Sequence, residues 1–253
     1  MPDPLLAVEG VSMRFGGLLA VDQASFAAAP GRITALIGPN GAGKTTLFAT
    51  ISGFLRPTAG RVVFDGADVT GLPPHRLARR GIARTFQIAQ PFAGLTVREN
   101  IAVGAHVRHP ARTAALAAAD GVAQAVGLAR DIDKPAAALT VAGRKRLELA
   151  RALAIEPRLL LLDEVLAGLN PSEIREMVPV VRAIAARGVT IVMIEHVMQA
   201  VMSLAELCYV LAEGRIIAQG APQAIAREPR VIEAYLGRGA AQRMAGEGTD
   251  AGT

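Results

Sequence analysis

The sequence Gly38-Pro39-Asn40-Gly41-Ala42-Gly43-Lys44-Thr45 matches the phosphate-loop pattern at every fixed position. Its glycines let the backbone turn so that several N–H groups face one point, and the N-terminus of a following helix adds positive potential there. Lys44 can reach the terminal phosphates of a nucleotide, and the hydroxyl of Thr45 can ligate Mg²⁺. We therefore expect these residues, together with Thr46, to bind a nucleoside triphosphate and its Mg²⁺.

The segments around this loop have the patterns of a strand and a helix. Arg32 to Ile37 is short, apolar and β-rich, and Lys44 to Ser52 is helical in pattern and ends at Gly53. Leu159 to Leu162 and Val189 to Ile194 are apolar runs typical of strands that are buried on both faces. Strands that alternate with helices predict an α/β fold, a P-loop NTPase with a mostly parallel sheet core.

Two further regions surround this core. Leu6 to Met13 and Leu18 to Ala29 have the patterns of strands in a half-buried antiparallel sheet, which predicts an antiparallel β subdomain. From Thr96 to Leu153 the residues Ala, Leu, Arg and Glu dominate and strand patterns are absent. This composition predicts a helical insertion over about residues 88–157, closed by Pro157.

An acidic pair follows the apolar run Leu159 to Leu162. Because ligands of open α/β sheets bind beyond the carboxyl ends of the strands, the run places Asp163 at a ligand-binding edge. We expect Asp163 to hold Mg²⁺ through water and Glu164 to polarise the attacking water. An acidic pair after a strand can also simply cap the next helix, but downstream of a phosphate loop it indicates nucleotide hydrolysis.

Length and composition favour one large domain. Of the 253 residues, 51% are hydrophobic and 19% are charged, which supports a sizeable core. We expect a single domain over residues 5–236 and a flexible tail over residues 237–253, where the chain is small and polar. The net charge of +5 could suit nucleic acid, but there is no run of five like charges, and a mild basic excess also suits docking at an anionic membrane face.

Secretion and membrane signals are weak in this sequence. Cys208 is the single cysteine and lies in an apolar stretch, so we expect a core residue rather than a disulfide partner. The N-terminus lacks the pattern of a signal peptide. No uncharged apolar run approaches the roughly 20 residues that a spanning helix needs. We therefore expect a soluble protein whose role at a membrane comes through a partner.

Four further segments narrow the class of nucleoside triphosphatase. Together they resemble the ATP-binding subunits of ABC transporters, over about residues 6–236. Gln87 lies at an expected strand end before the insertion, like the glutamine loop of that family. Leu139 to Leu153 is similar to the signature segment and the helix after it. Ala167 to Asn170 corresponds to the dimer-contact loop, and His196, which follows a buried strand, to the switch histidine.

Three details refine the resemblance. Phe15 precedes a Gly-Gly pair and matches the aromatic residue that stacks on adenine in the family, although an ordinary core phenylalanine is the alternative. Ala83 to Gln87 resembles the group that powers branched-chain amino-acid import. The terminal stretch Val231 to Gly237 resembles the same group, although an amphipathic helix that packs on the domain would explain it as well.

The resemblance implies that two ATPase subunits, identical or paralogous, meet head to tail. Each ATP would lie between Gly38–Thr46 of one subunit and Thr140, Ala142 and Gly143 of the other. The usual signature is Leu-Ser-Gly-Gly-Gln, whereas Leu139 to Gly143 keeps only the leucine and a hydroxyl. Val and Ala tolerate positive φ less well than Gly, so we expect this segment to adopt ordinary φ values or to shift slightly.

Other departures and roles follow from the same resemblance. Asn170 stands where Asp is usual, and the signature helix is expected over Arg144 to Leu153. Glu164 would align the attacking water, His196 would hold the γ-phosphate, and Gln87 would serve both catalysis and the Mg²⁺ site. The cofactors implied are ATP and Mg²⁺.

The implied partners are transmembrane permease subunits and, indirectly, a periplasmic substrate-binding protein; nucleic acid is not expected. The groove near Gln87 should receive a helix of the permease. The protein would then lie peripherally on the cytoplasmic face of the inner membrane. Branched-chain or other amino acids lead as cargo, and urea, short amides or aromatic acids stay open.

Three alternatives compete with this interpretation. A non-transport ABC ATPase acting on nucleic acid or the ribosome would typically carry coiled-coil insertions, zinc modules or two fused ATPase domains, whereas this chain has one phosphate loop and one cysteine. A small-molecule kinase would not explain the segments at Thr140, Asn170 and His196. A nucleotide-gated scaffold would bind ATP without cleaving it, and Glu164 argues against that.

Overall fold

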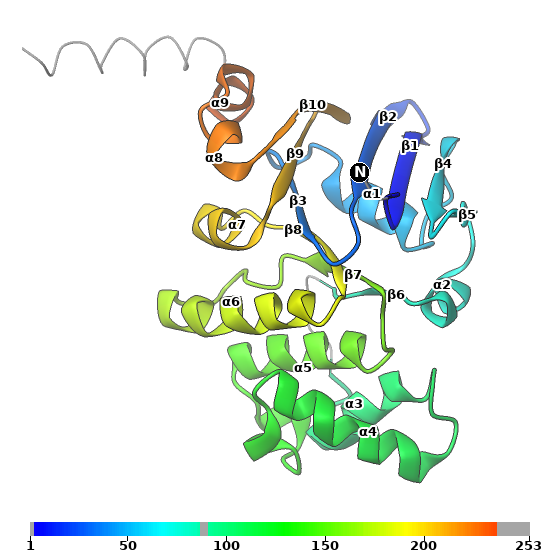
Figure 1. Cartoon of the computed structure of the whole chain (residues 1–253), viewed down its shortest axis with the longest axis vertical. Coiled ribbons are helices and arrows are strands. Elements are labelled where there is room, and N and C mark those ends of the chain that lie inside the picture. Colours follow the sequence, from blue (N-terminus) through cyan, green and yellow to red (C-terminus); the bar gives the residue numbers. More distant parts are fainter. Residues whose placement is uncertain (1–2, 87–90, 237–253) are drawn as a thin grey trace, which may run out of the picture.

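We describe the protein from a computed structural model, which covers residues 3–86 and 91–236. Two expectations lie outside the described residues: the roles of Gln87 and the tail over residues 237–253. Strands and helices alternate along the chain and build two sheets with helices around them (Figure 1).

The larger sheet has six strands in the order β10-β9-β3-β8-β7-β6. β3, β7 and β8 are buried at every position, because apolar residues cover both of their faces, and they pair in parallel. β10 joins as an antiparallel edge through the turn Glu213-Gly214, whose residues both have positive φ. The strand bounds are β3 Ile33–Ile37, β6 Ile82–Arg84, β7 Leu159–Asp163, β8 Thr190–Ile194, β9 Leu207–Ala212 and β10 Arg215–Gly220.

The smaller sheet is antiparallel, in the order β2-β1-β4-β5. Buried and more exposed residues alternate along much of β1, as expected for a sheet with one face on the core. Helix α1 (Lys44–Ile51) packs between the two sheets and shares one apolar cluster with both. The strand bounds are β1 Leu6–Phe15, β2 Leu18–Ala28, β4 Ala59–Phe64 and β5 Ala67–Asp68.

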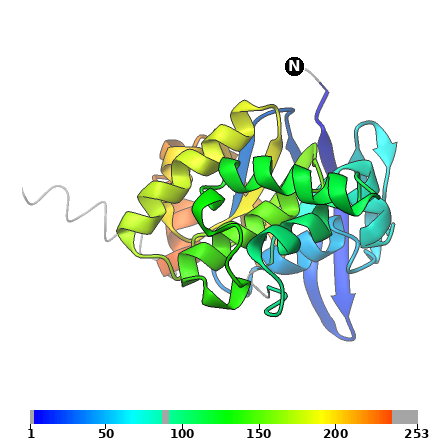
Figure 2. The ribbon, with the colours of Figure 1, turned by 90° about the horizontal axis from the view of Figure 1, so that it is seen from below.

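Three helices between β6 and β7 form the far end of the molecule (Figures 1 and 2): α3 Val97–Ala105, α4 Arg112–Ala125 and α5 Val141–Leu153. Thr96 begins α3 with a capping box, its side chain and that of Glu99 each bonding the other's main chain. α4 buries an alanine at every fourth position, which lets α3 and α5 pack close to it. A Cβ at Gly104 would overlap the Arg151 carbonyl, so α3 and α5 touch through backbone.

The parallel sheet separates two apolar clusters. Successive residues of β7 alternate between them: Leu160 packs with the helices α3 to α7, and Leu161 packs with α1 and the antiparallel sheet. Cys208 is fully buried in the first cluster, as expected, and burial raises the pKa of its thiol to about 11. Two further helices on this side are α6 Pro171–Ala186 and α7 Met198–Leu204.

Several short elements were not predicted from the sequence. They are α2 Pro74–Arg80, α7, α8 Pro222–Ile225 and two 3-10 turns, Ala129–Asp131 and Ala136–Ala138. The stretch that begins at Val231 is part of α9 (Pro229–Leu236), which buries Val231 against the domain as the amphipathic-helix alternative predicts. Among the described residues, no helix combines the length and apolar character needed to cross a membrane.

Candidate functional site

The loop from β3 to α1 depends on close backbone approaches. Gly38, Gly41 and Gly43 have φ values of 152°, 77° and 102°. A Cβ at Gly38 would overlap the carbonyl oxygen of Leu211, and one at Gly43 would overlap that of Ala20. Within the described chain no side chain caps α1, so its first-turn amides are available to a ligand at the loop.

Lys44 begins α1 and folds back over the loop. Its Nζ donates hydrogen bonds to the carbonyl oxygens of Gly38 and Pro39, both at 2.8 Å. Burial lowers the pKa of Lys44, while the nearby carboxylates of Glu164 and Asp163 act in the opposite direction. An ammonium group held here, over a glycine cradle, suits the phosphates of a nucleotide.

A cavity of about 580 Å³, which we call the phosphate-loop cavity, lies over this cradle. Phe15 lines it and is 45% exposed, so the alternative of an ordinary core phenylalanine is wrong. An exposed ring at the rim of a cavity is available for stacking on a base. The expected site residues that line the cavity are Phe15, Asn40, Gly41, Ala42, Gly43, Lys44, Thr45, Thr46 and Glu164.

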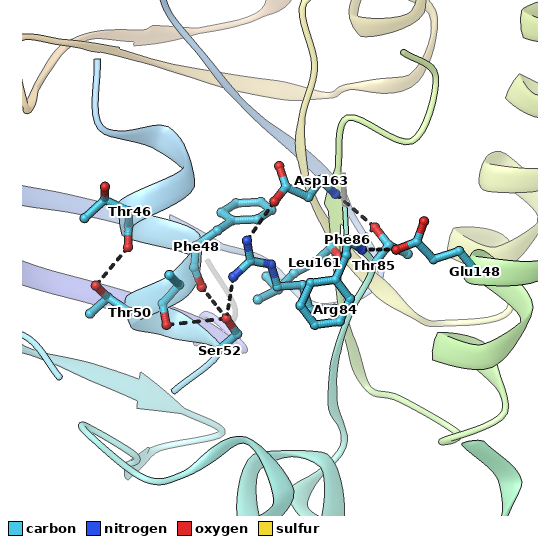
Figure 3. Close-up of polar contacts among 11 residues, drawn as sticks. Thr46, Phe48, Thr50, Ser52, Arg84, Thr85, Phe86, Glu148, Leu161 and Asp163 are labelled. Carbon is cyan, nitrogen blue, oxygen red and sulfur yellow. Dashed lines mark hydrogen bonds and ion pairs between the residues drawn. The ribbon is translucent and has the colours of Figure 1, made fainter. Parts of the chain in front are cut away.

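Asp163 ends β7 with its side chain only 3% exposed. Its main-chain N–H donates to the hydroxyl of Thr85 at 3.0 Å, and its Oδ2 accepts from Nη2 of Arg84 at 2.7 Å (Figure 3). Thr45 and Asp163 line a second cavity together. A hydroxyl and a carboxylate that share a cavity beside the phosphate loop are hard oxygen donors, which fits Mg²⁺ bound with nucleotide phosphates.

Glu164 has a φ of 48°, a left-handed conformation that is uncommon and strained for this residue type. Its main-chain N–H donates to the carbonyl of Ile194 at 3.0 Å, which ties it to β8. His196 follows the same strand, and its Nδ1 lies 3.9 Å from Oε1 of Glu164. The structure thus brings the expected catalytic pair together at the edge of the phosphate-loop cavity.

Behind this pair, sequence reasoning missed Glu195 and expected Lys145 near the subunit interface rather than in the interior. Glu195 is 1% exposed and accepts a hydrogen bond from the main-chain N–H of Leu166 at 2.9 Å. Burial is the main cause that raises the pKa of Glu195 to about 7. Lys145, also buried, donates from Nζ to the carbonyl of Glu164 at 3.3 Å. A charged residue next to His196 at the end of a buried strand was the available signal.

The signature segment differs from expectation in one respect. α5 begins at Val141 rather than Arg144, because the hydroxyl of Thr140 caps the helix by accepting from Gly143 N–H at 3.1 Å. The segment has ordinary φ values, as expected without its usual glycines. Among the described residues, neither Thr140 nor Ala142 and Gly143 line the phosphate-loop cavity of their own chain.

Asn170, which stands where Asp is usual in the family, caps α6. Its Oδ1 accepts from the main-chain N–H groups of Ser172 and Glu173, and Glu173 bonds back to Asn170 N–H at 2.8 Å. The capping needs only an acceptor oxygen, so the amide serves as well as a carboxylate. Leu166, in the same loop, is the residue that Glu195 holds.

The second cavity has a volume of about 780 Å³. It is a groove that lies between residues near the phosphate loop and the helices α3 and α5. We call it the insertion groove. Apolar side chains on its wall are unusually exposed: Phe86 48%, Phe92 46%, Val103 41% and Val107 37%. It is lined by Thr45, Arg84, Phe86, Phe92, Val103, Gly104, Val107, Glu148, Arg151, Ala152, Ile155 and Asp163.

Comparison with known proteins identifies this arrangement. The family model described as ABC transporter matches residues 21–167. The chain belongs to the ATP-binding subunits of ABC transporters. A second model, described as branched-chain amino acid ATP-binding cassette transporter, matches residues 215–241, which contain α9. As a member of this family, the chain hydrolyses ATP as part of a transporter.

Similar proteins share nearly the whole chain. The high-affinity branched-chain amino acid transport ATP-binding protein LivG of Escherichia coli is 39% identical over 94% of this chain and 99% of LivG. BraF of Pseudomonas aeruginosa, with the same description, is 38% identical with the same coverage. A nucleotide-free ATP-binding cassette superposes with a TM-score of 0.86 at 31% identity, covering 93% of this chain and all of that one. An ATP-binding cassette solved in its ADP conformation superposes with a TM-score of 0.85.

Proposed function

We propose that this ABC transporter subunit hydrolyses Mg²⁺·ATP at the phosphate-loop cavity to drive import of branched-chain or related amino acids. The observation that carries the chemistry is the approach of Glu164 and His196, 3.9 Å apart at the edge of a cavity that Lys44 and its loop also line. The resemblance to LivG and BraF supports the cargo class.

Each residue has a proposed role in this site. The loop amides and Lys44 bind the phosphates, and Phe15 stacks on the base. Thr45 and Asp163 hold the Mg²⁺, which balances phosphate charge when bound. Glu164 orients the attacking water and His196 holds the γ-phosphate. Gln87 is proposed to assist the metal and catalysis on the family resemblance alone, since it lies outside the described residues.

A second ATPase subunit completes the site in this proposal. Thr140, Ala142 and Gly143 lie at the start of α5, where Thr140 and Val141 are exposed, Ala142 is half-buried and Gly143 is buried. They do not line the cavity of their own chain, so a contact with nucleotide requires another subunit. The dipole of α5 would then point toward the γ-phosphate, and the exposed Arg144 of the basic run adds positive charge there, whereas Lys145 is buried.

The insertion groove is the proposed seat of a helix from a transmembrane permease subunit. Exposed apolar side chains gathered in one groove are typical of protein interfaces. In this proposal the subunit lies at the cytoplasmic face of the inner membrane, and a periplasmic binding protein delivers cargo to the permease on the other side. The helical insertion is proposed to provide one wall of the groove.

Complementation tests this function. The chain, co-expressed with its permease subunits and binding protein in cells that lack branched-chain amino-acid uptake, should restore leucine uptake and be recovered with the membranes. Glu164→Gln should be recovered with the membranes and restore no uptake. Tight binding to nucleic acid or ribosomes, with no membrane association and no uptake, would instead support the non-transport alternative.

A further inference from the structure

Arg84 ends β6 and lies between the proposed Mg²⁺ carboxylate and a set of aromatic rings (Figure 3). Its Nη2 donates to Oδ2 of Asp163 at 2.7 Å, and its Nη1 donates to the hydroxyl of Ser52 at 3.0 Å. The side chains of Arg84 and Asp163 are 9% and 3% exposed. None of the roles derived so far uses Arg84.

Burial makes this pair necessary when no metal is present. A carboxylate removed from water is costly unless a cation or hydrogen-bond donors satisfy it. Arg84 supplies a charge at Asp163, while Thr85 helps to place Asp163 by accepting from its main-chain N–H. The guanidinium therefore occupies the electrostatic role at Asp163 that a bound metal ion would otherwise fill.

The other side of the guanidinium faces aromatic rings. Its central carbon lies 6.0 Å from the ring centre of Phe48, 5.8 Å from that of Phe54 and 5.5 Å from that of Phe86. These contacts and the hydroxyl of Ser52 stabilise the cation independently of Asp163. Nε of Arg84 has no hydrogen-bond partner within the described residues. The carboxylate of Asp163 and the hydroxyl of Ser52 therefore hold the guanidinium through its two Nη atoms.

Arg84 also has room to leave the carboxylate. It lines the insertion groove together with Thr45 and Asp163. A divalent ion held at the carboxylate, directly or through water, would repel a guanidinium that is bonded to the same group, since like charges at a few ångströms in a partly buried site interact strongly. The groove offers the displaced cation water and the ring faces of its wall.

We propose that Arg84 is a positioning residue that neutralises Asp163 in the metal-free subunit and gives way when Mg²⁺ and ATP bind, which changes the aromatic wall of the insertion groove. This inference rests on the proposed metal role of Asp163. It makes Arg84 a physical link between the nucleotide site and the groove in which a permease helix is proposed to sit.

Two aromatic residues are placed to report and transmit such a change: Phe86, which lines the groove, and Phe54, which contacts Phe86. The rings of Phe54 and Phe86 meet edge to face with centres 5.6 Å apart, and both lie within reach of the guanidinium. The main-chain N–H of Phe86 donates to the carboxylate of Glu148 on α5. A shift of Arg84 therefore acts on the β6 end of the groove and, through Phe86, on its contact with the helical insertion.

A single-tryptophan reporter tests the link, because the chain contains no tryptophan. In Phe54→Trp, emission should change when Mg²⁺ and ATP are added together and change little with ATP and EDTA. Adding Arg84→Met should remove the Mg²⁺-dependent part of the signal. Arg158→Met is the matched control, since Arg158 also pairs with an aspartate and lies 5.8 Å from a ring centre, that of Phe64.

The second measurement is the Mg²⁺ midpoint for binding of a fluorescent ATP analogue. Removing a competing cation should lower that midpoint by roughly tenfold in Arg84→Met, the size of a screened charge repulsion. Arg84→Gln keeps a hydrogen-bonding group without the charge, and it should lower the midpoint as Arg84→Met does. This second variant keeps the test valid if Arg84→Met does not fold. Arg84→Lys should stay near wild type.

The outcomes separate the two proposals. An unchanged midpoint and an unchanged tryptophan response in folded Arg84→Met and Arg84→Gln would overturn the role of Arg84. If instead Asp163→Asn leaves the Mg²⁺ midpoint where it is, the proposed metal role of Asp163 is wrong. Circular dichroism and thermal unfolding in EDTA establish that each variant is folded before either result is read.

Discussion

Glu164 and His196 approach within 3.9 Å because their strands, β7 and β8, are parallel neighbours that end at the same edge. Residues that follow the two strands are therefore brought together although they are far apart in the sequence. The hydrogen bond from the main-chain N–H of Glu164 to the carbonyl of Ile194 fixes the backbone of Glu164. The left-handed φ of Glu164 turns its side chain out of the strand direction.

Glu164→Gln should keep ATP binding and lower turnover by roughly 10²–10⁴-fold, because an amide cannot polarise the attacking water as a carboxylate does. The variant should also accumulate as an ATP-bound dimer, since hydrolysis is what reopens it. Phosphate release and size-exclusion chromatography with ATP measure the two effects. Glu176→Gln on the outer face of α6 is the control, and a wild-type turnover in Glu164→Gln would refute the assignment.

Glu195→Gln should change how stability depends on pH. The folded-state pKa of Glu195, about 7, lies above the ordinary value of 4.5, so its contribution to stability is complete below pH 4.5 and is lost as pH rises to about 7. Relative to the variant, wild type should lose on the order of 2–3 kcal/mol across that window.

Thermal unfolding of wild type and Glu195→Gln between pH 4.5 and 8 measures this difference. Glu206→Gln, which removes an exposed carboxylate on the surface, should track wild type. Parallel pH curves for wild type and Glu195→Gln would show that the buried carboxyl does not titrate in this range.

Thr140→Ala should act on both stability and hydrolysis. Loss of the cap on α5 should lower the free energy of unfolding by about 1 kcal/mol. In the assembled complex, loss of a hydrogen bond to a charged phosphate, about 1.5–3 kcal/mol, should slow hydrolysis by about ten- to hundredfold. Thr140→Ser should be mild in both.

The two effects are separable by assay. Unfolding of the lone subunit reports the cap, while ATP affinity of the lone subunit should stay almost unchanged. Hydrolysis at the wild-type rate in the complex would mean that Thr140 does not contact the nucleotide of the partner subunit.

Gly43→Ala should abolish ATP binding, because the added methyl overlaps the Ala20 carbonyl and the φ of 102° disfavours any side chain. Gly41→Ala is a matched comparison: its φ is 77°, yet nothing lies within 4 Å of an added Cβ. We expect it to cost about 1 kcal/mol and to retain measurable binding. Titration with a fluorescent ATP analogue compares them, and equal affinities would argue that backbone approach at Gly43 is unimportant.

Sequence reasoning located the buried strands β3, β7 and β8 and the helix after the phosphate loop, because their signals are local. A phosphate loop needs glycines and a lysine at fixed spacing, and buried strands need continuous apolar runs, so Gly38 to Thr45 and Leu159 to Leu162 could be interpreted without a structure. The start of α5 lies three residues before its predicted position, because the side chain of Thr140 caps the helix in addition to being a candidate ligand contact.

The sequence by itself determined the chemistry of the nucleotide site, since phosphate and metal binding require particular residue types close together along the chain. Only the tertiary structure decided which charges meet across the sheet. The pairing of Arg84 with Asp163, the burial of Glu195 under Leu166 and the exposure of Phe15 all depend on strand order and on what packs above each strand end. Burial changes the electrostatic effect of a charged group, and the fold rather than the local sequence decides which groups are buried.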